Sequence, residues 1–293
     1  VTAVVELKAR FDEEQNINWA EELERAGVNV VYGFAGLKIH AKLCLVVRRE
    51  PKGMRRYAHI GTGNYNASSA KIYTDLGLFT ARDDICSDVQ DLFNVMTGFG
   101  VIDNYRRIFV SPNHLRANIT RLIREEAEIH RAKGGGRIIM KCNQLVDQGI
   151  VRELYEASRA GVKIECVVRG ICSLRPGIKN VSETISVHSI VGELLEHARI
   201  YYFEHGGEPV MYVGSADMMT RNLNGRIEVL TPVLDKKLMD NILKQIVNPQ
   251  LADNTHAWEL LSDGSYKKIK REAGVAAMDS QSHIKRVLNL LKR

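Results

Sequence analysis

Cysteines are few in this sequence and long apolar runs are absent, and both absences narrow what the protein can be. The five cysteines are odd in number, lie mostly in apolar segments and never form a C-x-x-C pair. Zinc-binding and disulfide-rich classes are therefore disfavoured, and a reducing cytoplasm is favoured. No apolar run approaches the roughly 20 residues that span a bilayer, and no secretory signal pattern opens the chain. We therefore expect no stable membrane insertion.

What is present fits a globular protein of one large or two ordinary domains. The chain has 293 residues, of which 45% are hydrophobic and 26% charged. A net charge of +6 permits a polyanionic ligand without requiring one. The chain opens at Val1 directly in a strand-like run, "VTAVVELKARF", which suggests a piece of a longer protein.

The chain contains one plan twice. The helix pattern "NWAEELERAG" leads into the strand "VNVVYGF", and "GIVRELYEASRAG" with "VKIECVVRG" repeats it. Each unit is followed by a strand with a histidine, His40 in "KIHAKLCLV" and His197 in "LEHARIYYF", and then by a glycine turn at Gly61 or Gly214. A segment of 23 extra residues precedes the second histidine strand. Four elements in the same order indicate an internal duplication.

Alternating strands and helices predict an α/β fold with mixed sheets flanked by helices. We expect two similar α/β domains, 1–109 and 110–293, divided near the Ser-Pro-Asn cluster at 111–113. The segment 115–133 predicts a long helix that ends at the glycines 134–136. The tail 276–293 predicts an amphipathic helix that serves packing.

Each histidine has a cation two residues later, Lys42 after His40 and Arg199 after His197. Positions two apart on a strand point the same way, so each histidine shares a face with its cation. Duplicated halves commonly face each other about a pseudo-twofold axis, which would bring all four side chains into one cleft. One neutral imidazole would attack phosphorus, the other would handle the leaving-group proton, and the cations would hold phosphate oxygens.

The two histidines are not equivalent in sequence. His40 precedes an apolar run, so we expect a deep, rigid strand, and Lys42 should lower the pKa of His40 and keep it neutral, as a nucleophile requires. Glu193 and Glu196 should raise the pKa of His197, which suits a general acid. Taken singly, a strand histidine is more often structural than catalytic. The turn residues expected to orient the histidines and donate to phosphate are Thr62, Asn64, Asn66 and Ser215.

The H-x-K of the first half with its G-x-x-N, repeated as H-x-R with G-x-x-D, resembles the phospholipase D superfamily. Longer stretches closely resemble bacterial polyphosphate kinases of the phospholipase-D-like type over nearly the whole chain: "VVELKARFDEEQNINWAEELERAGVNVVYGF", "KIHAKLCLV", "HIGTGNYN", "YTDLGLFT", "VRGICSLRPG", "SIVGELLEHARIYYF" and "SADMMTRNL". The resemblance implies two phospholipase-D-like domains and reversible transfer of the terminal phosphate of ATP to polyphosphate, through a phosphohistidine and with Mg²⁺.

The same resemblance implies a longer protein, with two further domains and the start of the first catalytic domain ahead of Val1. It implies ATP, ADP and polyphosphate as partners, no nucleic acid, and a homo-oligomer. The implied location is cytoplasmic, with peripheral association at a membrane as an open alternative.

Residue by residue, the resemblance implies that His40 is the phosphorylated nucleophile and His197 the second catalytic histidine and a nucleotide-phosphate contact. It assigns Tyr73 and Arg169 to nucleotide-phosphate contacts and Arg10 to the magnesium site. A guanidinium has no lone pair for a metal, so Arg10 is expected to act through a phosphate or a water. The remaining members of the expected ATP- and phosphate-binding set are Lys42, Asn64 and Arg199.

Three positions depart from these patterns. Val47 stands where a phospholipase D motif has an acid, which disfavours simple phosphodiester hydrolysis. His188 and Glu193 stand near the second histidine where the family usually has Arg. The arginines that remain there are Arg169, Arg175, Arg199, Arg221 and Arg226. From the residues alone, simpler alternatives stay open: Tyr73 as a strand cap, Arg169 paired with Glu165, and Arg10 paired with Asp12.

Three functions therefore compete. The first is the catalytic region of a polyphosphate kinase. The second is a phospholipase-D-like phosphodiesterase acting on lipid or nucleic acid, and the third is a polyanion-binding fragment that is catalytically incomplete. Acid-labile protein phosphate formed from ATP would separate the first from the others.

Overall fold

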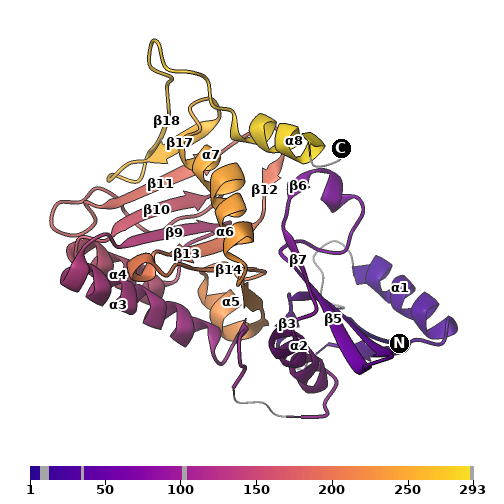
Figure 1. Cartoon of the computed structure of the whole chain (residues 1–293). Helices are drawn as coiled ribbons and strands as arrows, with labels where there is room; N and C mark the ends of the chain where they lie inside the picture. Colours follow the sequence, from indigo (N-terminus) through magenta and orange to yellow (C-terminus); the bar gives the residue numbers. More distant parts are fainter. Residues whose placement is uncertain (7–12, 34–35, 101–103, 291–293) are drawn as a thin grey trace.

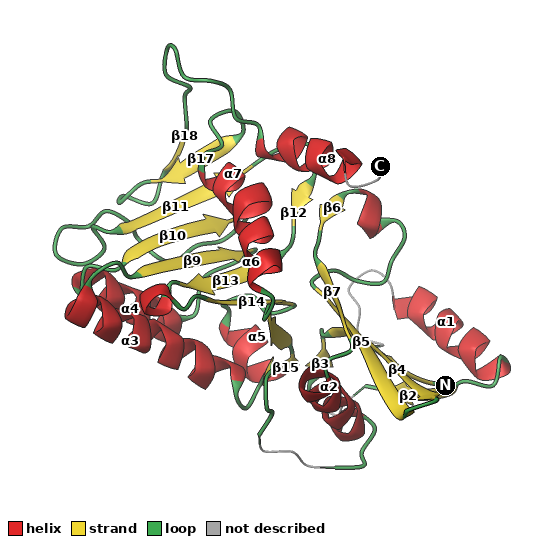
Figure 2. Ribbon diagram, viewed as in Figure 1, coloured by secondary structure: helices red, strands yellow, loops and turns green. Residues whose placement is uncertain are grey.

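Two bodies of sheet, built from the two halves of the chain, lie side by side (Figure 1). The computed structural model describes residues 1–6, 13–33, 36–100 and 104–290. Helices and strands alternate along both halves, the nine-stranded sheet of the second half carries helices on both faces, and α2 (Asp83–Met96) packs on one face of the first-half sheet (Figure 2). The expected mixed α/β architecture is confirmed.

The first half holds a parallel strand pair and a separate antiparallel sheet. Strands β1 and β2 pair in parallel, and the antiparallel sheet has the order β4-β5-β7. The elements are β1 (Thr2–Val5), α1 (Glu13–Arg25), β2 (Asn29–Tyr32), β3 (Lys38–Ile39), β4 (Lys42–Glu50), β5 (Gly53–Gly61), β6 (Tyr73–Thr74), β7 (Gly77–Thr80) and α2 (Asp83–Met96).

The second half is built on one nine-stranded mixed sheet, in the order β18-β17-β11-β10-β9-β13-β14-β16-β8. Its strands are β8 (Phe109–Val110), β9 (Arg137–Cys142), β10 (Lys163–Val168), β11 (Ile185–Ile190), β12 (Leu195–Glu196), β13 (Arg199–Phe203), β14 (Val210–Gly214), β15 (Arg226–Ile227), β16 (Val229–Pro232), β17 (Ala257–Leu260) and β18 (Tyr266–Lys268). Its helices are α3 (Leu115–Lys133), α4 (Gln148–Arg159), α5 (Thr220–Gly225), α6 (Lys236–Ile242), α7 (Asn248–Leu251) and α8 (Ser280–Leu290), with a π-helical turn at Leu243–Val247.

Element order supports the duplication. In both halves a parallel strand–helix–strand unit precedes the histidine, and antiparallel strands follow it: β1-α1-β2 then β4-β5, and β9-α4-β10 then β13-β14. The extra residues before the second histidine contain β11 and β12. Strand β8, which contains the predicted boundary at 109/110, pairs with β16 at the edge of the second-half sheet. The boundary itself stays a prediction.

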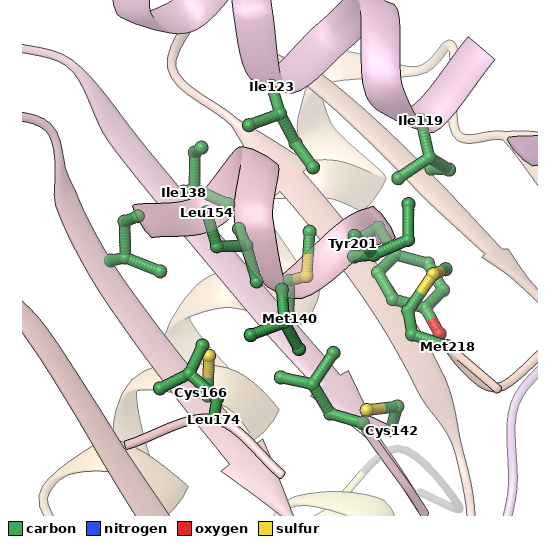
Figure 3. Close-up of a cluster of buried hydrophobic side chains, with 14 of the residues drawn as sticks. Ile119, Ile123, Ile138, Met140, Cys142, Leu154, Cys166, Leu174, Tyr201 and Met218 are labelled. Atoms are coloured by element: carbon green, nitrogen blue, oxygen red, sulfur yellow. The ribbon is translucent and has the colours of Figure 1, made fainter. Parts of the chain in front are cut away.

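The main core lies between the nine-stranded sheet and helices α3 and α4. Apolar side chains at helical spacing on α3, such as Ile119 and Ile123, meet Ile138 and Met140 of β9 (Figure 3). The helix begins and ends at the residues that the sequence predicts. It ends at Lys133 because Gly134 follows with a φ of 71°.

The two halves are interlocked through a shared core. Helix α2 packs on β5, and Ile227 and Val229 of the second half are buried in that same cluster with Ile60. Strand β15 also pairs in parallel with β3. Glu228, between β15 and β16, is fully buried but is not part of this apolar cluster. This arrangement places a second-half side chain against the first-half histidine.

The strand predicted over 37–46 is broken at the histidine. Lys38–Ile39 pair with β15, whereas Lys42 onward pair with β5. Between them, the backbone N–H groups of His40 and Ala41 both donate to the Ile227 carbonyl, each at 3.0 Å. The chain changes strand partner at His40, so a single continuous strand was the wrong expectation.

Strand β4 is also less deep than its composition suggests. Lys42 is buried, but Val46 and Val47 are about half exposed, at 50% and 48%. The corresponding face in the second half is covered by α3 and α4, which bury Tyr201 and Phe203 of β13 completely. On the first-half sheet the equivalent positions, Cys44 and Val46, are exposed. The expectation of a deep strand is therefore wrong beyond its first residues, because its described surroundings include no helix on that face.

Candidate active site

His40 is held by an acid from the other half of the chain. Its Nδ1 lies 2.9 Å from Oε2 of Glu228, whose side chain is fully buried. An ionised carboxylate only accepts, so Nδ1 carries the proton and Nε2 keeps its lone pair. The His40 side chain is 22% exposed. Burial, together with the charges of Lys42 and Arg199, lowers its pKa although the Glu228 carboxylate acts in the opposite direction, so the resting ring is neutral.

His197 has the mirrored arrangement. Its Nδ1 lies 2.8 Å from Oδ1 of Asp75, which belongs to the first half. Burial, together with the charges of Arg199 and Lys42, lowers the pKa of His197 although Asp75 acts in the opposite direction. The ring is more crowded than that of His40: Tyr73 lies with its ring centroid 4.8 Å away, and Nη1 of Arg199 lies 3.2 Å from Nε2.

The two acids are the functional residues that sequence reasoning missed. Thr62, in the first glycine turn, donates to Asp75 at 2.6 Å, and Ser215, in the second turn, donates to Glu228. The hydroxyl precedes the acid by 13 residues in both halves. That equal spacing in the printed sequence was the available signal. Of the four turn residues expected to orient the histidines, Thr62 and Ser215 contact the acids that hold them.

Lys42 and Arg199 are both buried, and the charge of each acts on both histidines. Burial lowers the pKa of Lys42 to about 7, with Arg199 and Arg226 acting in the same direction. Its ammonium donates to the His40 carbonyl. Arg199 carries charge that acts on both His40 and His197. The structure therefore brings both histidines and both cations into one electrostatic site between the halves.

Arg199 is heavily engaged within the protein. It donates to both oxygens of Asp217, at 3.3 and 3.0 Å, and to the backbone carbonyls of Thr62 and His197. These bonds join the second-half strand β13 to the first glycine turn. Its assignment as a phosphate contact stays a prediction, and its observed contacts give it a structural role.

Of the remaining predicted contacts, Arg169 lies close enough to Arg199 and Asp75 for their charges to act on it. Arg169 donates to the Glu196 carbonyl at 2.9 Å. The alternative pairing of Arg169 with Glu165 is wrong, because Glu165 pairs with Arg137 and Lys163. Asn64 is exposed in the first glycine turn, while the side-chain oxygen of Asn66 accepts from the backbone of Ser68 and Ser69. Arg10 lies outside the described residues.

The expected influence of Glu193 and Glu196 on His197 is wrong. The Glu193 carboxylate pairs with Lys285 on the surface, and Glu196 is buried against Lys141 at 2.9 Å. Adjacent strand residues point to opposite faces, so Glu196 turns away from the His197 ring. The acid that acts on His197 is Asp75. His188 lies on β11, between β10 and β17, where burial lowers its pKa.

A resident metal site does not emerge from this chemistry. Within residues 1–6, 13–33, 36–100 and 104–290, no three His, Cys, Asp or Glu side chains converge to hold an ion. None of the described helices is both long and apolar enough to cross a bilayer.

Known proteins of one family resemble this chain in sequence and in fold. Two family models match the chain, "Polyphosphate kinase C-terminal domain 1" over residues 1–102 and "Polyphosphate kinase C-terminal domain 2" over residues 108–281. Polyphosphate kinase 1 of Chlorobaculum tepidum is 52% identical over 273 residues, covering 93% of this chain and 39% of that protein. Polyphosphate kinase of Synechocystis sp. is 52% identical over 283 residues, covering 96% and 39%.

A solved structure gives the same result. The crystal structure of polyphosphate kinase from Porphyromonas gingivalis superposes with a TM-score of 0.91 at 37% identity, covering all of this chain and 44% of that one. The chain spans about two fifths of the length of the curated relatives it matches. With family models that together cover nearly every residue, the chain belongs to the polyphosphate kinase family.

Proposed function

We propose that this chain carries the phosphoryl-transfer site of a polyphosphate kinase, which moves the terminal phosphate of ATP reversibly to polyphosphate through a phosphohistidine at His40. The observation that carries the proposal is the His40–Glu228 contact. A buried carboxylate fixes the proton on Nδ1 and leaves Nε2 with its lone pair, on a side chain that is 22% exposed.

The chemistry at His40 is a displacement at phosphorus. The Nε2 lone pair forms a bond to the γ-phosphorus, the bond to the β–γ bridging oxygen breaks, and its electron pair leaves with ADP. The ring becomes a cation, which the buried Glu228 carboxylate stabilises. Reversal, with a terminal polyphosphate oxygen as the attacking atom, passes the phosphoryl group to the growing chain.

His197 acts as the general acid and base in this scheme. Its neutral resting form has a lone pair on Nε2, so it accepts a proton in the direction that forms ATP, and its protonated form returns that proton in the reverse direction. Asp75 stabilises the protonated form. The Arg199 guanidinium beside Nε2 makes His197 the poorer nucleophile, which supports the assignment of attack to His40.

The phosphates would lie between Lys42, Tyr73, Arg169 and the exposed Asn64. A phosphate beside Lys42 favours its charged form, so binding and protonation of that side chain are linked. Magnesium would enter bound to the phosphates of ATP, as Mg·ATP. Homo-oligomer formation, cytoplasmic location and peripheral membrane association stay predictions.

The test uses the full-length protein that contains this chain. Incubation with γ-labelled ATP and Mg²⁺ should give acid-labile, base-stable protein phosphate, and peptide mapping should place it on the His40 peptide. His40→Ala should abolish both this label and polymer synthesis, while His188→Ala serves as the control and keeps them. Label on the His197 peptide with none on that of His40 would reverse the assignment.

A further inference from the structure

A buried polar cluster beside the His197 backbone connects this residue to helix α8. At its centre is the Glu196 carboxylate, which is 2% exposed. Oε2 contacts Lys141 Nζ at 2.9 Å, Gln250 Nε2 at 2.7 Å and Thr74 Oγ1 at 3.1 Å. Oε1 accepts from Gln281 Nε2 at 2.8 Å. We call these five residues the Glu196 cluster.

Gln281, the second residue of α8, uses its whole amide in this cluster. Besides its bond to Glu196, it donates to the Leu194 carbonyl at 2.7 Å and accepts from the Leu194 N–H at 2.9 Å. It therefore binds the segment before His197 as a neighbouring strand would. A Cβ on Gly192 would come within 2.4 Å of the Gln281 oxygen, so glycine there permits the close approach.

Strand register transmits this attachment to the histidine. Strand β12 pairs with β6 so that Leu195 lies opposite Tyr73 and Glu196 opposite Thr74. One residue further along each strand are His197 and Asp75, which form the 2.8 Å contact of the site. Thr74 Oγ1 also accepts from the His197 backbone N–H at 3.3 Å. Any slip of β12 against β6 therefore displaces the His197 ring from Asp75.

Helix α8 is anchored strongly enough to set that register. Ser280, which is fully buried, donates twice to Asp253, at 2.9 Å from its backbone and 2.7 Å from its hydroxyl. Figure 1 shows α8 (yellow) beside β12 and β6, where the two halves meet. We expected this tail to serve packing. Packing does not account for the buried Gln281 amide and its hydrogen bonds to Leu194 and Glu196.

We propose that Gln281 is a positioning residue for His197, so that the C-terminal helix α8 holds the acid–base histidine against Asp75 from the other half of the chain. This inference rests on the proposed function of His197. It assigns no contact with substrate to Gln281, which acts through Leu194 and Glu196. The consequence is that α8 influences the rate of proton handling through the His197–Asp75 contact.

The test replaces Gln281 with methionine, which has a similar volume and no hydrogen bonds, in the full-length protein. We expect kcat for polymer synthesis to fall by about 10- to 100-fold, because small misplacements of a catalytic group cost that much. The limb of the kcat–pH profile that belongs to His197 should move to lower pH, because Asp75 no longer supports its protonated form.

Two further variants keep the result interpretable. Thr74→Val removes the hydroxyl that joins Glu196 to the His197 backbone without changing the side-chain volume much, and it should reproduce the same fall in kcat and the same pH shift. Lys285→Met, on the same helix, removes only an exposed pair with Glu193 and should leave kcat and the pH profile unchanged.

A Gln281→Met protein whose kcat and pH profile match those of the parent overturns the proposal, whatever its melting temperature. If the Gln281→Met protein fails to fold, Thr74→Val becomes the deciding variant. An unchanged kcat and pH profile in Thr74→Val would then overturn the proposal. Failure of the proposed function is distinguished from both outcomes, because it shows in the unaltered protein as an absence of phosphate on His40.

Discussion

Replacing Glu228 by glutamine separates the charge of this acid from its hydrogen bonds. Oε2 accepts from His40 and Ser215, and Oε1 accepts from Asn222 Nδ2 at 2.6 Å. In the variant, the amide oxygen can stay beside His40 while its NH₂ faces Asn222. The Asn222 amide can turn to accept from it, because its own Oδ1 is buried and has no hydrogen-bond partner among the described residues. The geometry of the site is therefore preserved and only the negative charge is lost.

The size of the effect follows from that geometry. Hydrogen bonds to charged groups contribute about 1.5–3 kcal/mol and neutral ones about 0.5–1.5 kcal/mol, so the difference is about 1–2 kcal/mol. Since 1.36 kcal/mol is a factor of ten, Glu228→Gln should slow phosphorylation of His40 by about 5- to 30-fold. Glu228→Met, which removes the acceptor altogether, should slow it by about 10³-fold or more, because the His40 tautomer is no longer fixed.

The assay is single-turnover labelling of the full-length protein with γ-labelled ATP over a range of pH. Glu228 raises the pKa of His40 against the effect of burial, so the acidic limb of the profile should move to lower pH in Glu228→Gln. Glu193→Gln, at a surface acid, is the matched control and should change the rate by less than twofold. Equal rates for the Gln and Met variants, or no loss in either, would refute the reasoning.

Further expectations concern the second histidine and the two cations. His197→Ala should slow polymer synthesis by about 10²-fold or more while phosphate stays trapped on the nucleophile, and a peptide map without any label would contradict this. Asp75→Asn should move the His197 limb of the kcat–pH profile to lower pH, because the carboxylate that raises the pKa of His197 is gone; an unmoved limb would argue against the contact. Lys42 has a pKa of about 7 and loses its charge as pH rises through that value, so KM for ATP should increase from pH 6 to 8.5, whereas Lys42→Arg should give a flat profile. Arg199→Met leaves buried Asp217 without its cation and should lower the free energy of unfolding by about 3–5 kcal/mol in denaturant titrations, and a loss below about 1 kcal/mol would contradict its structural role.

Sequence patterns predicted the secondary structure correctly where it depends on the residues of the local segment alone. The helix at 115–133 was predicted to its last residue, since its apolar spacing and the following glycines are properties of that segment alone. The break at His40 was not predicted, because it arises where β3 leaves β15, more than 180 residues away in the chain. Exposure along β4 likewise depends on which helices cover it, and an apolar composition does not report that.

In the site as well, the sequence predicted some residues and could not predict their partners. The histidines and cations stand out in the sequence because they recur beside glycine turns, but their acids come from the opposite half. The pairings His40 with Glu228 and His197 with Asp75 span 188 and 122 residues. Sequence proximity pointed instead to Glu196, which strand alternation turns to the other side. Only the fold shows which carboxylate meets which ring.

The exchange of acids between the halves has a consequence for how such a site can arise. Each half gives its histidine to the acid of the other, which is the reciprocal contact pattern of an isologous twofold interface. Two identical copies associating about such an axis would make the same contact twice and need no second gene product. When the two copies are joined in one chain, their sequences no longer have to be identical. The two contacts are then free to diverge, and here one acid is a glutamate and the other an aspartate, while the cations are Lys42 and Arg199.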